Sequence, residues 1–561
     1  MTGRIRTWLA SSCGLVLLVG ALVAASASSS AREGNDFTST RVSGINVDAT
    51  TIPQLQHLMD QHKLSSEKLV TFYLHRIEEL NPKLHAVITV SPTAKADARA
   101  ADRARRNGDH RPLLGIPVLV KDNIDTTGMP TTAGSLALAG STPPNAFIVD
   151  RLRAAGALIL GKTNLSEWAN FRDNQSSSGW SGVGGQTNLA YALDRNPCGS
   201  SSGSGVAASA DLATVTIGTE TDGSIVCPAS ASGDVGIKPT LGLASRSGIV
   251  PISAEQDTAG PITRNVTDAA VVLGAITGVD PSDPATSAQP GNVHTDYTTF
   301  LHAGALNGAR IGVWRAGNFG LSPETDVIME AAIAKMKALG ATIVDPTDIP
   351  IEPALDPEFT ALLFEFKHDI AAYLAHTAPQ YPKTLQDLID FNNAHSAQEL
   401  QFFGQEVFEQ AQATGTLSDP AYIKARHDAT SIAQKAIDDT LATNHLDAII
   451  APTSTPAWTT DLINGDHFSV GSSSPAAISG YASITVPAGT SFDLPVGVSF
   501  IAGKWAEPKL IALAYAWEQA THVRKPPQFL PSIPVTGMTS GRHDRVRTDA
   551  PQRAATPHAP M

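Results

Sequence analysis

The chain of 561 residues is poor in cysteine and in charge, and each shortage excludes a class of protein. It has three cysteines, no CxxC pair and no HExxH motif, so the sequence indicates no metal site and no cofactor. Charged residues make up 17% of it, and 53 acidic residues outnumber 40 basic ones. A chain of net charge −13 is not expected to bind nucleic acid or an anionic membrane by general electrostatic attraction.

Long apolar runs are also missing, except for one near the amino terminus. Two arginines precede the run at residues 14–25, which is too short to span a bilayer comfortably, and an A-x-A pattern ends at Ala27. This order predicts a signal peptide over residues 1–27, cleaved near Ala27, and export to the periplasm or the medium. An uncleaved membrane anchor is the alternative. We expect no integral membrane partner for the rest of the chain.

Cys198 and Cys227 are the cysteines that remain after such a cleavage. An oxidising compartment allows them to form a disulfide. Two small buried thiols that pack behind a site are the alternative, and the sequence leaves both interpretations open.

The composition predicts one folded domain from residue 46 to residue 530, because no linker-like shift interrupts it. Residues 28–45 are rich in serine and polar side chains, which predicts a loose leader. Residues 534–561 are rich in arginine, proline, threonine and histidine and nearly lack apolar side chains, so we expect a disordered tail.

Helical and strand-like patterns alternate within this domain. Apolar residues recur at helical spacing over 52–80, where Asn81-Pro82 is expected to end the helix, and residues 92–107 predict a second amphipathic helix. Runs typical of strands lie at 116–120, 157–159, 214–217, 310–313, 342–344 and 448–451, and helical stretches such as 143–155 and 267–277 separate many of them. Residues 358–444 are mainly helical and are expected to cap a site. The pattern predicts a layered α/β fold around a largely buried sheet.

The most informative residues are Lys121, Ser200 and Ser224. Lys121 follows the apolar run 113–120, and both serines lie in glycine-rich segments. Burial lowers the pKa of a lysine, and its neutral form can then take a proton from a serine hydroxyl. The three residues therefore predict hydrolysis of an amide by serine and lysine, without histidine. The alternative for Lys121 is a structural ion pair with Asp122.

The segment that ends at Ser224 also offers hydrogen-bond donors to a substrate. Its glycines permit backbone conformations that other residues resist. The successive backbone N–H groups of Thr221, Asp222, Gly223 and Ser224 are predicted to form an oxyanion hole.

These motifs resemble those of the amidase signature family of serine amidohydrolases. The matching segments are 115–123, 161–167, 196–204, 218–230, 236–240, 257–261, 451–453 and 494–497. The resemblance implies a mixed central β-sheet covered by helices on both sides. It also implies a triad in which Ser224 is the nucleophile, Ser200 lies at a cis peptide bond and relays the proton, and Lys121 is the base.

Two residues depart from the common family pattern around the nucleophile. Val226 stands where the family often has arginine, so a bidentate ion pair with a substrate carboxylate is excluded there and a neutral substrate end is favoured. Asp222 adds a carboxylate two residues before Ser224, and it either accepts a hydrogen bond from the substrate or fixes the loop. Within the family, segments 168–172, 197–205 and 219–228 are similar to bacterial peptide amidases, which implies that the C-terminal amide of a peptide is released as ammonia.

Substrate contacts are predicted at Met129 and Thr131, on a loop that resembles the pocket-lining segment of the family, and at Ser201 and Asp222. The substrate is expected to be a short peptide amide or another small amide. The alternatives are an aryl- or fatty-acyl-amide hydrolase and, disfavoured by the predicted export, the glutaminase component of an amidotransferase. The G-x-S-x-G pattern around Ser201 is also typical of α/β-hydrolases, but no histidine with a supporting motif accompanies it.

Overall fold

The computed structural model describes residues 39–534. The predicted signal peptide and the tail beyond residue 534 lie outside the described residues. Part of the predicted leader belongs to the fold, because β1 (Arg41–Val42) pairs antiparallel with β2 (Ile45–Asn46). The compact unit accordingly begins at Thr40, a few residues before the predicted boundary.

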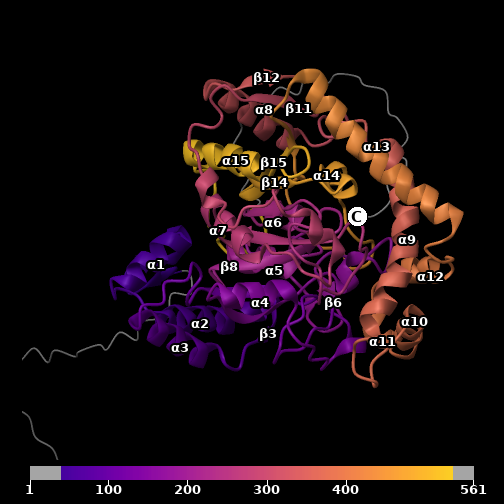
Figure 1. The fold of residues 1–561 in the computed structure, drawn as a ribbon, viewed down its shortest axis with the longest axis horizontal. Coiled ribbons are helices and arrows are strands. Elements are labelled where there is room, and N and C mark those ends of the chain that lie inside the picture. Colours follow the sequence, from indigo (N-terminus) through magenta and orange to yellow (C-terminus); the bar gives the residue numbers. More distant parts are fainter. Residues whose placement is uncertain (1–38, 535–561) are drawn as a thin grey trace, which may run out of the picture. The chain divides into compact units, whose positions relative to one another are not determined.

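Eleven strands form one mixed sheet, which is visible in Figure 1. Its order is β12 (Thr342–Val344), β11 (Arg310–Val313), β13 (Ala448–Pro452), β15 (Leu494–Ile501), β14 (Ser483–Ser491), β9 (Val235–Lys238), β10 (Thr258–Thr263), β8 (Val215–Glu220), β4 (Pro117–Lys121), β5 (Leu158–Thr163) and β3 (Val87–Val90). All six predicted strands are confirmed. A separate pair is formed by β6 (Trp180–Ser181) and β7 (Gly185–Gln186).

A parallel group of three strands lies toward the β3 edge of the sheet. β4 runs parallel to both of its neighbours, β5 and β8, and every residue of these three strands is buried. From β8 through β10, β9, β14 and β15 to β13, neighbouring strands are antiparallel. The carboxyl ends of β4 and β8 therefore lie side by side, and they carry Lys121 and Glu220.

The predicted helix over residues 52–80 is wrong in two respects. It is two helices, α1 (Ile52–Asp60) and α2 (Ser66–Leu84), because His62 takes a left-handed conformation and the Ser65 side chain caps α2 by accepting from Lys68 N at 3.2 Å. Pro82 also does not end the helix. It lies in the last turn, where it removes a single backbone hydrogen bond.

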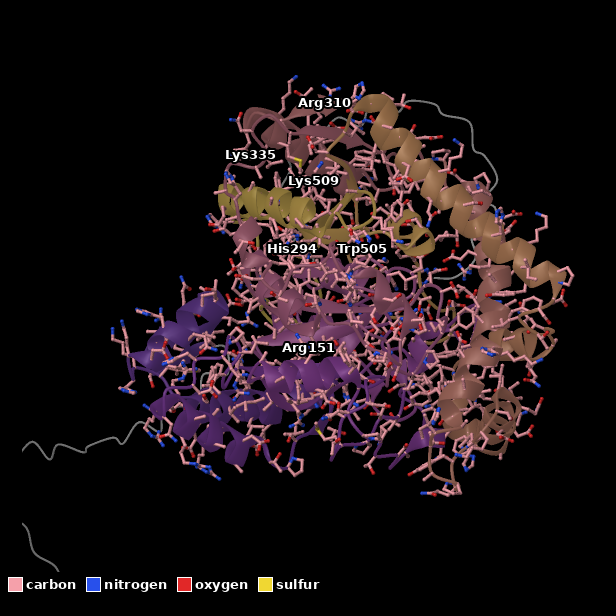
Figure 2. All side chains as sticks on the ribbon, viewed as in Figure 1. Arg151, His294, Arg310, Lys335, Trp505 and Lys509 are labelled. Atoms are coloured by element: carbon pink, nitrogen blue, oxygen red, sulfur yellow. A yellow bond between two sulfur atoms is a disulfide. The ribbon has the colours of Figure 1, made fainter. Side chains whose placement is uncertain are left out.

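Helices cover the sheet on both sides (Figure 1). Those not yet named are α3 (Ala94–Arg106), α4 (Phe147–Ala154), α5 (Ser202–Ser209), α6 (Val226–Ala231), α7 (Val266–Ile276), α8 (Pro323–Ala338), α9 (Glu352–Leu374), α10 (Leu385–Ala394), α11 (Ser396–Glu399), α12 (Glu406–Gln412), α13 (Pro420–Asn444), α14 (Ser474–Ser479) and α15 (Glu507–Thr521). Arg151 and Lys509 mark α4 and α15 in Figure 2. Within residues 39–534, no helix combines the length and apolar character needed to cross a bilayer.

The predicted helical segment 358–444 is confirmed as α9 to α13. An apolar cluster joins α9, α10 and α12 to Trp168 and Phe171. Phe171 packs edge-on against Phe366 of α9, with ring centroids 5.2 Å apart. These contacts attach the segment to the part of the chain that precedes Ser200.

Candidate active site

Lys121 ends β4 with a fully buried side chain. Its Nζ donates to Ser200 Oγ at 2.7 Å and to Thr219 Oγ1 at 2.9 Å, and it lies 3.3 Å from the Thr219 carbonyl oxygen. Asn123 Nδ2 donates to the same threonine hydroxyl at 2.9 Å. Residues from β4, β8 and the Gly/Ser loop before α5 thus meet at the lysine.

The alternative of an ion pair between Lys121 and Asp122 is wrong. Asp122 pairs with Lys162 of β5, with 3.3 Å between Oδ1 and Nζ. Successive side chains along an extended chain point to opposite faces, so two neighbours such as Lys121 and Asp122 diverge. Lys121 is thereby left to face Ser200 and Thr219.

Burial lowers the pKa of Lys121 to about 7, although the nearby carboxylates of Asp257 and Glu220 oppose this effect. A lysine with this pKa exchanges its proton near neutral pH. Lys121 therefore has the property that a general base requires.

Ser200 is fully buried and follows a cis peptide bond from Gly199. Its carbonyl oxygen accepts from Ser166 N at 3.0 Å. A Cβ at position 199 would lie 2.3 Å from Ser166 Oγ, so only glycine fits there. The segment that contains Ser166 therefore fixes Ser200 next to Lys121.

Ser224 lies in the loop between β8 and α6 and is 7% exposed. Its carbonyl oxygen accepts from Ser201 N at 3.1 Å. Ser201 Oγ donates to Thr219 O at 3.0 Å and accepts from Thr219 N at 3.2 Å. Ser201 thus joins the Ser200 loop to the Ser224 loop, and its hydroxyl is held by the backbone of β8.

The buried carboxylate of Glu220 shapes the same loop. It accepts from Ile225 N at 2.7 Å and from Val226 N at 3.0 Å. Burial raises the pKa of Glu220, and these backbone hydrogen bonds, with a further one from Gly223, oppose the rise. Among the predicted oxyanion-hole donors, the N–H of Gly223 is thus oriented toward Glu220.

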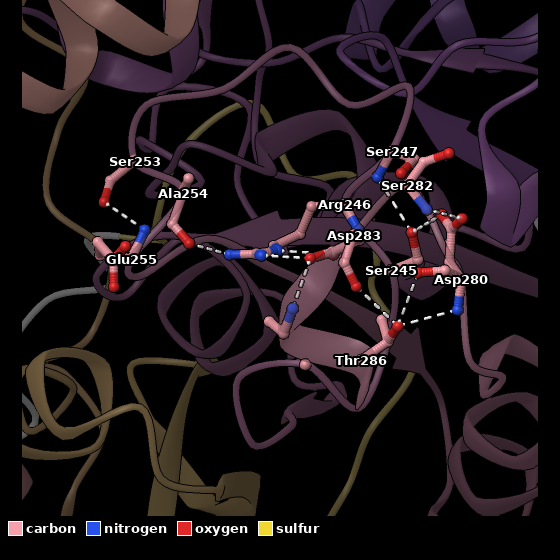
Figure 3. Close-up of polar contacts among 12 residues, drawn as sticks. Ser245, Arg246, Ser247, Ser253, Ala254, Glu255, Asp280, Ser282, Asp283 and Thr286 are labelled. Atoms are coloured by element: carbon pink, nitrogen blue, oxygen red, sulfur yellow. Dashed lines mark hydrogen bonds and ion pairs between the residues drawn. The ribbon is translucent and has the colours of Figure 1, made fainter. Parts of the chain in front are cut away.

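A second carboxylate, Asp257, supports the loop from the other side. Its Oδ1 accepts from Thr221 Oγ1 at 2.6 Å, and its Oδ2 accepts from Ile252 N at 2.8 Å and from Ser253 N at 3.0 Å. Figure 3 shows how Arg246 ties this stretch to Asp283, through a 2.9 Å contact of Nε with Oδ2 and a hydrogen bond to the Ala254 carbonyl. Asp257 consequently links Thr221 to the segment 252–257.

The helical segment reaches the nucleophile loop through a chain of side chains. Arg426 of α13 donates to Gln256 Oε1 at 3.0 Å, and Gln256 Nε2 donates to the Thr221 carbonyl at 3.3 Å. Gln256 also donates to Glu358 of α9 at 2.5 Å. The predicted cap therefore contacts the loop that carries Ser224.

Two further residues that were predicted to contact the substrate, Met129 and Thr131, are both buried. Met129 is buried, with 2% exposed. Thr131 is fully buried, and its hydroxyl accepts from Lys162 Nζ at 2.8 Å. Thr131 thus belongs to the network of the Asp122–Lys162 ion pair.

Asp222 is half-buried, and burial raises its pKa to about 6. Hydrogen bonds from Ser473 and Ser474 oppose the rise. These bonds support the interpretation that Asp222 fixes the loop. Its Oδ1 is buried and accepts no hydrogen bond from residues 39–534.

A disulfide links Cys198 to Cys227, with Cα atoms 5.9 Å apart. The choice between a disulfide and two thiols is therefore settled in favour of the disulfide. It joins the loop before Ser200 to helix α6 after Ser224, across 29 residues of sequence.

Replacing both cysteines by alanine is expected to lower the free energy of unfolding by about 3–4 kcal/mol, because the 29-residue loop is no longer closed in the unfolded chain. Urea unfolding of the two proteins measures the difference. Reduction of the wild-type protein should produce the same shift, and an unchanged midpoint in the double variant would contradict the prediction.

Sequence reasoning missed Thr219, Glu220 and Asp257 as members of the site. All three lie inside the family-like segments 218–230 and 257–261. Polar side chains in or beside a buried strand could have indicated these residues as part of the site, because a buried carboxylate requires hydrogen-bond donors.

A mixed sheet in which two neighbouring parallel strands bring a lysine with a lowered pKa to two joined serine loops is typical of a serine amidohydrolase. The Amidase family model matches residues 68–511. The structure of peptide amidase from Stenotrophomonas maltophilia is 50% identical, with a TM-score of 0.82, and the match covers 86% of this chain and 99% of that one.

Two relatives found by sequence similarity support the same family. A probable amidase of Arabidopsis thaliana is 41% identical over 501 residues, which cover 87% of this chain and 93% of the relative. One component of the glutamyl-tRNA(Gln) amidotransferase of Caldanaerobacter subterraneus is 36% identical over 498 residues, with 86% and 98% covered. The chain belongs to the amidase family and is an amidase.

Proposed function

We propose that this amidase hydrolyses the C-terminal carboxamide of peptides to the acid and ammonia, with Ser224, Ser200 and Lys121 as its triad. The observation that carries the proposal is the 2.7 Å contact between buried Lys121 Nζ and Ser200 Oγ, on the loop that Ser201 joins to Ser224. The similarity to a peptide amidase supports the substrate class.

In the first half-reaction, Ser224 Oγ attacks the carbonyl carbon of the amide. Its proton passes to Ser200 Oγ while the Ser200 proton passes to neutral Lys121 Nζ. The negative oxygen is stabilised by the predicted backbone donors that Glu220 leaves available, the N–H groups of Thr221, Asp222 and Ser224. When the C–N bond breaks, the proton returns from Lys121 through Ser200 to the leaving nitrogen, and ammonia departs.

In the second half-reaction, water attacks the ester carbonyl of the acyl-enzyme. Ser200 and Lys121 take the proton of that water and then return it to Ser224 Oγ, which leaves as the hydroxyl. The products are the free acid and the starting enzyme. No cofactor takes part in any of these steps.

The residues around the loop support a substrate with an uncharged end. Val226 contributes no positive charge, and its N–H is bound by Glu220. The carboxylates of Asp222 and Glu220 would repel a substrate carboxylate at this position. Met129 is retained as a proposed apolar contact.

The rate is expected to rise with pH and to level off above about pH 7, because Lys121 accepts a proton only when neutral. With a pKa of about 7, kcat/KM at pH 5 should be about one hundredth of the plateau. The profile is measured with an uncharged peptide amide, beside circular dichroism at each pH. A flat profile between pH 5 and 9 would contradict the role of Lys121.

Substrate class is tested by ammonia release from an N-acetylated dipeptide amide, and by turnover of an anilide, a fatty-acid amide and glutamine. We expect the peptide amide to have the highest kcat/KM. Turnover of the anilide or fatty amide alone would favour the second candidate, an aryl- or fatty-acyl-amide hydrolase. Preference for glutamine would favour the activity that the amidotransferase relative suggests.

We also propose that the enzyme is exported after cleavage near Ala27. The basic start, the apolar run and the A-x-A pattern support this proposal, and so does the disulfide. Amino-terminal sequencing of the protein recovered from the periplasm or medium tests it, and an intact Met1 there would contradict it.

A further inference from the structure

A cleft of about 700 Å³ lies between α1, α4 and α7, with loops around residues 110–112 and 295–298 as its remaining walls. This volume is typical of small-molecule sites. Neither the triad nor the loops that carry it line the cleft. It is therefore a feature that the amidase chemistry does not use.

Basic side chains outnumber acidic ones in the lining of the cleft, although the chain as a whole is acidic. The groups that are or can become positive are His57, Arg105, His110, Arg111 and Arg151. The acidic ones are Asp60 and Asp296. Local charge of the opposite sign to the net charge favours an anionic ligand at this place.

Arg151, on α4 in Figure 2, is the cation without a partner. Within residues 39–534 its guanidinium makes no ion pair, and its Nε is buried without an acceptor. The close approach of Gly278 and Phe147 holds the side chain, since a Cβ at 278 would lie 3.3 Å from both Nε and the ring. Its two terminal nitrogens are not among the buried unpaired atoms and make no hydrogen bond within residues 39–534, so they are the donors that a ligand in the cleft can reach.

The other two arginines are fixed beside it. Arg111 donates to the carbonyls of Arg153 and Ala154, at 3.3 and 3.1 Å, and pairs with Asp109. Arg105 is bound to Asp60 and donates to Leu114 O at 2.8 Å, and its Nε is also buried without an acceptor. Asp60 and Asp109 thus neutralise these two arginines, and Arg151 is left as the arginine of the cleft that has no ion pair within residues 39–534.

The remaining walls are apolar. Ile52, Pro53, Pro112, Val271 and Ala275 line them. We propose that this cleft binds a small organic anion, with its acidic group on Arg151 and its apolar body against these residues. Arginine suits a carboxylate, sulfonate or phosphate because its planar guanidinium offers two parallel donors.

The probe for this site is anilinonaphthalene sulfonate, an aromatic sulfonate whose fluorescence rises when it enters an apolar cavity. Titration of the signal-peptide-free protein should give one saturable site. Arg151→Gln should weaken this binding at least tenfold. The matched control is Arg153→Gln, an exposed neighbour on the same helix, which should change it less than twofold.

A second variant tests the sign of the charge. Asp296→Asn removes a negative group from the rim and should tighten sulfonate binding about threefold. The uncharged analogue N-phenylnaphthylamine should bind all of these proteins equally. Thermal unfolding within a few degrees of wild type shows that each variant is folded.

Three results would overturn the proposal. The first is unchanged sulfonate binding in Arg151→Gln. The second is an equal loss in Arg151→Gln and Arg153→Gln, which indicates general surface attraction. The third is displacement of the probe by a peptide amide bound to Ser224→Ala protein, which places the probe in the active site. The proposal does not depend on the substrate proposed above.

Discussion

Replacing Ser224 by alanine is expected to abolish ammonia release, with a fall in kcat of about a millionfold. The change removes the oxygen that is proposed to form the acyl-enzyme and leaves the surrounding loop intact. That loop is held by Glu220, which accepts from Ile225 N and Val226 N, and by the backbone bond from Ser201 N to Ser224 O. None of these contacts uses the Ser224 side chain. The measurement is ammonia release from a peptide amide under single-turnover conditions.

The matched control is Ser232→Ala, just beyond the end of α6. The Ser232 hydroxyl is buried and has no hydrogen-bond partner within residues 39–534, so its removal should change kcat less than twofold. Calorimetry should show that Ser224→Ala protein still binds the amide. Appreciable turnover by this variant, after exclusion of wild-type contamination, would show that another group is the nucleophile.

Replacing Lys121 by alanine is expected to lower kcat by about 10³–10⁴-fold without unfolding the protein, because the reaction loses its general base. Lys121 is fully buried, and its Nζ bonds only neutral groups of Ser200 and Thr219, so no buried countercharge is left unpaired. Near its pKa of about 7, much of the lysine is already neutral. The fall is measured as kcat with the same peptide amide, beside the circular dichroism spectrum.

Two substitutions separate basicity from packing and charge. Lys121→Met fills the same space without a nitrogen, and Lys121→Arg keeps a positive charge that is not lost at any accessible pH. Both should be as inactive as Lys121→Ala. Activity in Lys121→Arg would show that the site requires a positive charge, and wild-type activity in Lys121→Ala would refute the proposed mechanism.

The sequence predicted the local features of the site because short motifs carry them. Lys121 follows a run of buried strand residues, and glycines flank both serines. The contacts that fix these residues come from distant parts of the chain. Asp257 meets Thr221 only because β10 pairs with β8, and such pairing of strands cannot be predicted from local pattern.

The same limit explains the strands that the sequence did not indicate. β10 and β15 contain both glycine and proline, which weaken a strand pattern, although most of their residues are fully buried. The break between α1 and α2 could, in contrast, have been predicted, because Ser65 followed by Glu67 is typical of a helix start. The apolar residues keep their helical spacing across the break, and for that reason the pattern predicted a single helix.

The proposed triad lies on β4 and on the loops beside β8, whereas α9 to α13 form a separate helical segment. This separation has a consequence for the evolution of the enzyme. The proposed reacting groups lie within residues 121–224, and Arg426 and Glu358 of the helical segment contact their loop through Gln256. We therefore expect mutations in α9 to α13, other than those at Glu358 and Arg426, to affect bond cleavage less than mutations within residues 121–224. We expect this segment to be the productive target for directed evolution toward new amides.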